Sequence, residues 1–237
     1  MEAIILAGGK AERLGEAALD RPKALVDIAG KPLAAYQIAQ LAGAGVERVI
    51  LSCVAGQEPR FEAELGGLGP ELVAVGEPEP LGRGGGLRFA ARARREEGDV
   101  LALNGDELLA LDFAALLARH RETGAAGTVT VTRPRSPFGV VQLGEDDAIA
   151  GFHEADLLPE WVSCGVYALG EEAIAALPER GDHERTTFPA LAAAGRLRAF
   201  RYEGVWLTVN TPKELRTADE HVRAHPEWLD VGESAGV

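Results

Sequence analysis

Residues 4–23 read IILAGGKAERLGEAALDRPK, and this stretch indicates the class of fold. The apolar run 4–7 predicts a buried strand, which ends at Gly8 and Gly9. Because glycine has no Cβ, backbone N–H groups at such a strand end can approach an anion closely. Two glycines after a strand are also a common tight turn, so the glycines alone leave both interpretations open.

Three cations lie close to this turn in the sequence, at Lys10, Arg13 and Lys23. Arg13 can bind two phosphate oxygens at once, and Lys23, directly after Pro22, can supply a point charge. The whole chain carries a net charge of -13, so these cations together predict a local positive site that attracts an anion. We therefore expect a polyphosphate site, although the stretch matches neither the P-loop nor the dinucleotide-binding pattern.

Composition limits the classes of protein to consider. The chain has 237 residues, of which 46% are hydrophobic, and this suits one large α/β domain. It contains no apolar stretch of the roughly 20 residues that span a bilayer and no secretory leader pattern, so we expect a cytoplasmic protein without a membrane partner. The acidic charge argues against a nucleic-acid partner. Cys53 and Cys164 lie in apolar surroundings and are expected to be reduced core residues.

Expected strands and helices alternate through the first half of the chain. The expected strands are 4–7, 48–54, 72–75 and 100–103, and the expected helices are 33–44, 58–65, 85–97 and 112–123. This alternation predicts a parallel sheet with helices on both faces.

The pattern changes after residue 127, where strands at 128–132, 140–143, 148–152 and 162–169 predict antiparallel pairing. Further expected elements are helices at 171–177 and 188–194, strands at 197–202 and 205–209, and a closing helix at 212–225. We expect one domain over residues 1–225, with a first half 1–126, a second half 127–225 and a flexible tail 226–237.

Chemistry-bearing residues follow two further strands, and open parallel sheets bind ligands beyond the carboxyl ends of their strands. The stretch 77–87 reads EPEPLGRGGGL and leads into an expected helix. A glycine-rich helix start can receive a phosphate or a base, although a flexible connector has the same composition. Asn104, Gly105 and Asp106 follow the next strand. They are ordinary turn residues, but their position favours a site.

The first-half motifs resemble those of the nucleotidyltransferases that activate sugar 1-phosphates. The family's opening signature is L-A-G-G-x-G-T-R-L followed by P-K, and residues 6–14 with Pro22-Lys23 resemble it, with Ala11 and Glu12 as departures. Residues 81–87 resemble the family's L-G-T-A-G-A-L, which lies against the base and ribose, with Arg83 in place of the threonine. Gly105-Asp106 resembles the family's G-D, whose aspartate binds Mg²⁺.

The second-half motifs resemble the family's acceptor region and its last metal ligand. Residues 152–154 and 162–167 resemble E-K-P and N-A-G-I-Y, with Ala155 and Ser163 replacing the lysine and the asparagine. Residues 206–215 resemble W-x-D-I-G-T-P-x-x-L, with Thr208 at the aspartate position and Asn210 at the glycine position. Asn210 can supply a hard oxygen ligand, but a helix-capping role for this stretch, with Thr211 before a proline, stays open.

The resemblance spans roughly residues 2–222 and implies a three-layer, Rossmann-like α/β fold of the glycosyltransferase-A type, mostly parallel with an antiparallel acceptor-binding portion. It implies the following roles: catalytic Lys10, Arg13 and Lys23; nucleotide-binding Leu6, Ala7, Gly8, Gly9, Glu79, Gly82, Gly84 and Gly85; acceptor-binding Asn104, Glu154, Ser163 and Gly165; and Mg²⁺-binding Asp106 and Asn210.

The resemblance also implies the reaction. We expect a Mg²⁺-dependent nucleotidyltransferase that joins a nucleoside monophosphate from an NTP, with GTP favoured, to a phosphorylated small molecule and releases pyrophosphate. Residues 186–191, 195–197 and 204–206 resemble mannose-1-phosphate guanylyltransferase-like chains, which favours a sugar 1-phosphate as the acceptor. A molybdopterin or phosphocholine-type acceptor stays open. So does a non-catalytic nucleotide sensor, since Thr208 and Ala155 replace two family residues. The sequence leaves the oligomeric state open.

Overall fold

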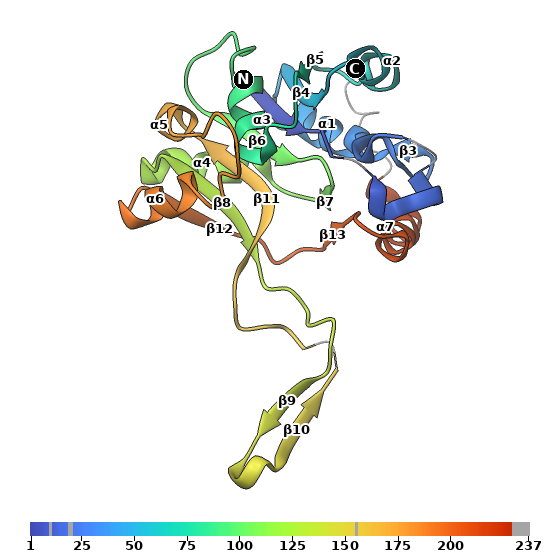
Figure 1. Ribbon diagram of the computed structural model, residues 1–237, viewed down its shortest axis with the longest axis vertical. Coiled ribbons are helices and arrows are strands. Elements are labelled where there is room, and N and C mark those ends of the chain that lie inside the picture. Colours follow the sequence, from blue (N-terminus) through green and yellow to red (C-terminus); the bar gives the residue numbers. More distant parts are fainter. Residues whose placement is uncertain (10, 19–20, 155, 229–237) are drawn as a thin grey trace.

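The computed structural model describes residues 1–9, 11–18, 21–154 and 156–228. Lys10 and Ala155 lie outside the described residues, as does the chain from residue 229 onward, which holds most of the expected tail. The centre of the fold is a seven-stranded sheet (Figure 1). Its strands, in spatial order, are β12 (Leu197–Arg201), β8 (Gly127–Thr132), β11 (Val162–Leu169), β6 (Val100–Asn104), β1 (Glu2–Leu6), β4 (Arg48–Val54) and β5 (Glu71–Glu77).

Strand directions confirm the predicted fold class. β1 pairs in parallel with β4 and β6, β4 pairs in parallel with β5, and β12 pairs in parallel with β8. β11 runs antiparallel to both of its neighbours, β6 and β8. The sheet is therefore mostly parallel, with its antiparallel strand in the second half of the chain.

Helices cover both faces because the central strands are apolar on both sides. On β1, Ala3 and Ile5 face one core cluster and Ile4 faces the other, and all three side chains are buried. The first cluster is covered by α1 (Leu33–Gly43), α2 (Glu58–Leu65) and α4 (Phe113–Thr123), and the second by α3 (Gly82–Ala91), α5 (Glu171–Ala175) and α6 (Thr187–Ala193). Cys53 and Cys164 are buried and free, as the sequence predicts.

A third cluster attaches the last helix, α7 (Pro212–Ala224), to the start of the chain. Val222 of α7 packs with Leu14 of η1 (Glu12–Ala18) and with Tyr36 of α1. Two short ladders frame this region: β2 (Asp27–Ile28) with β3 (Lys31–Pro32), and β7 (Glu107–Leu109) with β13 (Trp206–Thr208). The β7–β13 ladder brings the end of the chain beside the residues that follow β6.

Two expected strands lie outside the main sheet. β9 (Val140–Leu143) and β10 (Ile149–His153) form an antiparallel hairpin, joined by η3 (Glu145–Asp147), that projects far from the body (Figure 1). We call residues 133–161 the arm. The two segments that connect the hairpin to the body form the stem of the arm. They are joined by a bridge between Arg135 and Leu157 and by a hydrogen bond from the Ser136 N–H to the Asp156 carbonyl. Within the described part of the chain, no helix combines the length and apolar character that a membrane span needs.

Candidate active site

A cavity of about 710 Å³ opens at the carboxyl ends of β1, β5 and β6. Its lining includes nine of the predicted site residues: Leu6, Ala7, Gly8, Gly9, Lys23, Glu79, Gly82, Asn104 and Asp106. They come from segments far apart in the sequence, and the parallel sheet brings them together because its strands end along one edge.

Backbone contacts shape the floor of the cavity. The Gly105 N–H donates to the Leu6 carbonyl (2.9 Å), and a Cβ at position 105 would lie 2.5 Å from that oxygen, so only glycine fits. The Lys23 N–H donates to the Gly9 carbonyl (3.4 Å). Among the described residues, no backbone carbonyl accepts a hydrogen bond from the N–H of Gly8 or Gly9. These N–H groups therefore suit a phosphate oxygen.

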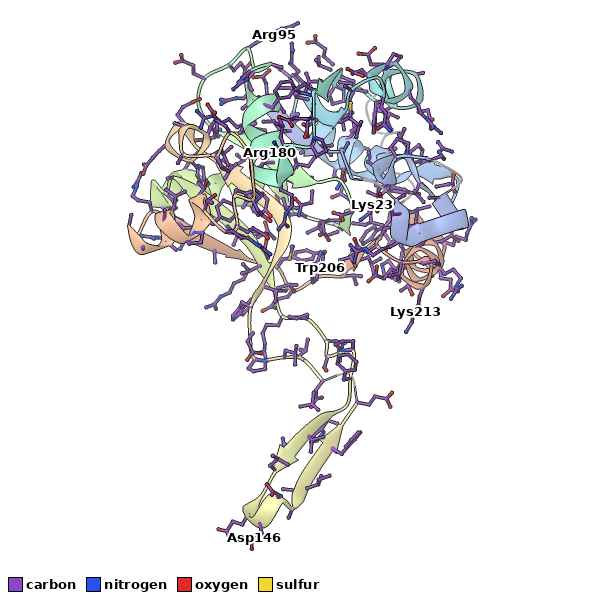
Figure 2. All side chains as sticks on the ribbon, in the orientation of Figure 1. Lys23, Arg95, Asp146, Arg180, Trp206 and Lys213 are labelled. Carbon is purple, nitrogen blue, oxygen red and sulfur yellow. The ribbon has the colours of Figure 1, made fainter. Side chains whose placement is uncertain are left out.

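Lys23 connects the two halves of the site. It begins η2 (Lys23–Leu25), directly after Pro22, and its side chain is mostly buried. Its Nζ donates to Asp106 Oδ2 (2.9 Å) and to Asn210 Oδ1 (2.6 Å). Arg13 donates to the same Asn210 oxygen over 3.4 Å. The structure thus gathers four predicted residues into one polar cluster, with Lys23 at its centre. Figure 2 labels Lys23.

Asn210 reaches this cluster because the ladder and the helix on either side of it fix its backbone. The Val209 N–H donates to the Asp106 carbonyl (3.0 Å), immediately after β13. Thr211 caps α7 in a reciprocal capping box with Glu214. Thr211 is therefore the residue that caps α7, and the Asn210 side chain contacts Lys23 instead. Thr208 instead pairs with Glu107 in the β7–β13 ladder.

Asp106 and Asn210 form a donor set that fits a divalent cation. Their two oxygens share one ammonium group and are hard, oxygen-type ligands of the kind that Mg²⁺ prefers. The described residues contain no group of three or more His, Cys, Asp or Glu side chains able to hold a metal. A Mg²⁺ ion between Asp106 and Asn210 would thus depend on substrate phosphates and water for its other ligands.

Glu77 is a residue of the cavity wall to which sequence analysis gave no role. Its Oε1 accepts from the Ser52 hydroxyl (2.8 Å), and its Oε2 accepts from the Leu81 N–H (3.0 Å). A Cβ at Gly86 would lie 2.7 Å from that Oε1, so the glycine lets α3 pack against the carboxylate. Glu77 therefore holds the loop before α3 in place. Its signal in the sequence is an acidic residue at the very end of an apolar strand.

The glycines of α3 differ from the prediction, which placed them before the helix. α3 begins at Gly82, so they form its first turn. The N–H groups of Gly84 and Gly85 donate to the Gly181 carbonyl, over 2.9 and 3.3 Å. A Cβ at either position would lie 2.7 Å from backbone of the segment 179–183. These two glycines are outside the cavity lining and serve close packing, whereas Gly82 and Glu79 line the cavity.

Arg83, the departure from the family motif, joins α3 to the second half of the chain. Its guanidinium pairs with Asp182 (2.5 Å) and Glu184 (2.6 Å). Glu184 in turn accepts from the Tyr167 hydroxyl of β11 (3.1 Å). An arginine therefore stands where the family motif has a threonine, and it forms an ion-paired bridge from α3 to Asp182 and Glu184.

Three of the four predicted acceptor residues lie together. Gly165 has a φ of +71°, and a Cβ there would lie 2.5 Å from Asn104 Nδ2, so the position requires glycine. The Gly165 N–H donates to the Ser163 hydroxyl (3.2 Å). Asn104 is buried, and its Oδ1 has no hydrogen-bond partner among the described residues. The fourth residue, Glu154, directly follows β10 on the arm and does not line the cavity.

Glu107 is a buried acid next to this cluster that sequence analysis missed. Burial raises the pKa of its carboxyl to about 8, and the neighbouring Asp106 charge adds to the rise. A hydrogen bond from Trp206 Nε1 (2.7 Å) and the Lys23 charge lower the same pKa. Gln37 holds the turn between β6 and β7, because its Nε2 donates to the carbonyls of Asn104 and Glu107, both over 2.8 Å.

Known protein sequences include relatives of this chain. The sequence profile of the family described as nucleotidyl transferase matches residues 2–235. A mannose-1-phosphate guanylyltransferase of Mycobacterium tuberculosis is 33% identical in an alignment of 226 residues that covers 91% of this chain and 62% of that protein. The catalytic subunit beta of mannose-1-phosphate guanylyltransferase from Xenopus tropicalis is 33% identical in a gapped alignment of 248 residues that covers 98% of this chain and 69% of that protein. The chain therefore spans less than the full length of these relatives.

Solved structures share the fold. The inositol-1-phosphate CTP transferase from T. maritima superposes with a TM-score of 0.74 at 20% identity, covering 100% of this chain and 98% of the other. HddC from Yersinia pseudotuberculosis superposes with a TM-score of 0.73 at 23% identity, covering 93% of this chain and 98% of the other. Similarity at these identities establishes the architecture, and the chemistry must be argued from the site.

Proposed function

The chain belongs to the nucleotidyl transferase family, and on that premise we propose that it transfers a nucleoside monophosphate from an NTP to a sugar 1-phosphate. One observation carries this proposal. The Lys23 ammonium, held by Asp106 and Asn210, lies at the wall of a cavity whose floor is the Gly8-Gly9 turn. That arrangement suits the transfer of a phosphoryl-type group between two anionic substrates.

The proposed chemistry is an in-line displacement at the α-phosphorus. A phosphate oxygen of the acceptor forms the new P–O bond, the bond to the β-phosphate breaks, and pyrophosphate leaves. No side chain acts as a nucleophile. Lys23 neutralises charge where the α-phosphate and the acceptor phosphate meet, and Arg13 holds the departing phosphates. The N–H groups of Gly8 and Gly9 hold the remaining phosphate oxygens.

Mg²⁺ would be held by Asp106 and Asn210, whose oxygens already converge on a cation. When bound, the ion supplies charge neutralisation for the triphosphate and orients its oxygens. Both ligands sit on backbone that hydrogen bonds fix, because the Val209 N–H bonds to the Asp106 carbonyl. The two halves of the chain would therefore present one ligand each.

The acceptor would lie on the side of Asn104, Ser163 and Gly165. Asn104 Oδ1 is buried without a partner among the described residues, which suits a hydroxyl donor from a sugar. GTP and mannose 1-phosphate are the first substrates to test, because the relatives that share 33% identity are mannose-1-phosphate guanylyltransferases.

The test is pyrophosphate release from each of the four NTPs with a panel of sugar 1-phosphates, with the nucleotide sugar identified by mass spectrometry. We expect turnover that depends on Mg²⁺ and is fastest with GTP and mannose 1-phosphate. Phosphocholine belongs in the panel as a non-sugar acceptor. Tight binding of nucleotide with no turnover on any acceptor would refute the enzyme proposal and indicate a nucleotide sensor.

A further inference from the structure

The arm exposes an apolar surface on one side. Leu143 pairs with Ile149, and Val141 pairs with Phe152, across the β9–β10 hairpin. Residues paired across two strands share a face, and so do residues two apart on one strand, so all four side chains point the same way. A β-bulge between Ile149 and Gly151 brings Ile149 and Phe152 onto that common face. Leu143, Ile149 and Phe152 are each about two thirds exposed.

The opposite face of the hairpin is less apolar, with Gln142 paired to Gly151 and His153 paired to Val140. The hairpin is thus amphipathic although it touches none of the seven strands of the body (Figure 1). An isolated two-stranded hairpin is only marginally stable in water, and a row of exposed apolar side chains marks a contact surface.

Charge differs between the two ends of the arm. The tip carries Glu145, Asp146 and Asp147, and none of these carboxylates is ion-paired within the described part of the chain (Asp146 in Figure 2). The root borders a groove of about 1120 Å³ that holds Arg133 and Lys213, both exposed and unpaired with any described carboxylate. The groove also contains one exposed acid, Glu203.

The same groove offers apolar surface beside its cations. Leu157, Trp161 and Val205 line it, and each is more than two fifths exposed. Arg201 lies over the Trp161 ring at 5.2 Å and adds another cation to this end of the arm. The groove therefore matches the hairpin in both respects, with apolar side chains for the apolar face and cations for the acidic tip.

The tip of the arm cannot reach the groove at the root of the same arm. The stem is held extended by the hydrogen bonds from the Ser136 N–H to the Asp156 carbonyl and from the Leu158 N–H to the Pro134 carbonyl. Asp146 at the tip therefore stays distant from Trp206 and Lys213, which line the groove of the same chain (Figure 2). Two chains related by a two-fold axis can cover both the apolar hairpin face and the acidic tip. If the two arms lie antiparallel, the tip of each arm lies at the root of the other.

We propose that this protein forms a two-fold symmetric homodimer in which the arms lie antiparallel and the acidic tip of each occupies the groove at the root of the other. The apolar faces of the two hairpins are then covered between the chains. The arm and the groove together supply a surface of the order of the 20 to 30 residues per partner that stable interfaces use. This association is independent of the nucleotidyl transfer proposed above.

The test is the association state of the purified chain by sedimentation equilibrium. Wild type should be a dimer, and Leu143→Asp with Phe152→Asp should weaken dimerisation at least about a hundredfold. Gln142→Asp with His153→Asp is the matched control, since it adds the same two negative charges to the opposite face and should leave the dimer intact. Leu143 and Phe152 are already exposed, so far-UV circular dichroism should show an unchanged fold.

A charge exchange tests the register of the two arms. Asp146→Lys with Asp147→Lys should weaken the dimer about tenfold or more, and adding Arg133→Glu with Lys213→Glu should restore most of the loss. A wild type that stays monomeric at all concentrations would overturn the proposal and leave the arm to another partner. A dimer insensitive to Leu143→Asp and Phe152→Asp, or one that the charge exchange fails to restore, would overturn the arm-to-groove geometry.

Discussion

Lys23→Met is the substitution that tests the proposed chemistry most directly. It keeps the length of the side chain but removes the ammonium that contacts Asp106 and Asn210. If that charge acts mainly between the two reacting phosphates, its loss should appear in kcat rather than in nucleotide affinity. Removing one preorganised donor to developing charge commonly costs about 10²–10³ in rate. We expect kcat to fall at least about a hundredfold, or about 2.7 kcal/mol in activation free energy.

The fold should tolerate the same change. The Asp106 side chain is 27% exposed, so water can replace the lost ammonium contact. A partly exposed ion pair contributes at most about 1 kcal/mol, which corresponds to about 2–4 °C in the Tm of a domain this long. A loss of activity with a small change in Tm would therefore report on chemistry and not on unfolding.

The assay is steady-state pyrophosphate release at saturating Mg²⁺, with separate titrations of nucleotide and acceptor. Lys31→Met is the matched control, because Lys31 lies in β3 and does not line the cavity. It should retain wild-type kcat. An unchanged kcat for Lys23→Met with a large rise in the nucleotide KM would refute the transition-state role and leave Lys23 as a binding residue.

Four further predictions have definite expected outcomes. Asp106→Asn should abolish Mg²⁺-dependent turnover with little change in Tm, and turnover near wild type would exclude Asp106 as a metal ligand. Gly165→Ala should cost about 1–3 kcal/mol in unfolding free energy and raise the acceptor KM, since its φ is +71° and its Cβ would meet Asn104; urea denaturation and acceptor titration measure both. Burial lowers the pKa of His183 to about 4, and both ring nitrogens lack hydrogen-bond partners among the described residues. Below pH 6.5 the unfolded chain binds a proton that the folded chain rejects, so wild type should lose up to about 3 kcal/mol relative to His183→Phe between pH 6.5 and 4, and parallel stability curves would contradict this. Thr208→Asp should lower stability and fail to rescue Asn210→Ala, because residue 208 pairs with the buried Glu107; recovered turnover in the double variant would show that residue 208 reaches the metal.

Sequence analysis located the strand ends that line the cavity because strand ends are local features of the chain. An apolar run that stops at glycine marks the sheet edge, and Gly8 and Asp106 lie just beyond the ends of β1 and β6. Asp112 caps α4 through the Ala115 N–H (2.8 Å), as its type and position indicate. These features depend on neighbours in the chain and can be recognised there.

Contacts between distant segments could not be predicted in the same way. The pairing of Arg83 with Asp182 and Glu184 joins residues about a hundred positions apart. The packing of Gly84 against the segment 178–183 could not be predicted either. In the sequence, a glycine that lets another backbone segment approach cannot be distinguished from a glycine that lets a phosphate approach. The position of the arm also escaped prediction. Alternation of apolar and polar residues predicts a strand but does not indicate which sheet that strand joins.

Asn210, the second proposed metal ligand, shows how a motif position acquires its role from the fold. In the family's pattern the aspartate stands at position 208, but the β7–β13 ladder directs residue 208 to Glu107. The ladder ends at residue 208. The Val209 N–H then donates a hydrogen bond to the Asp106 carbonyl, and the chain continues to Thr211, the N-cap of α7. Asn210 is the first side chain beyond that hydrogen bond, and it meets Lys23 and Arg13. An amide in place of a carboxylate leaves Asp106 as the sole anion contacting Lys23 among the described residues. The cluster therefore keeps more net positive charge, which favours phosphates over the bare metal ion.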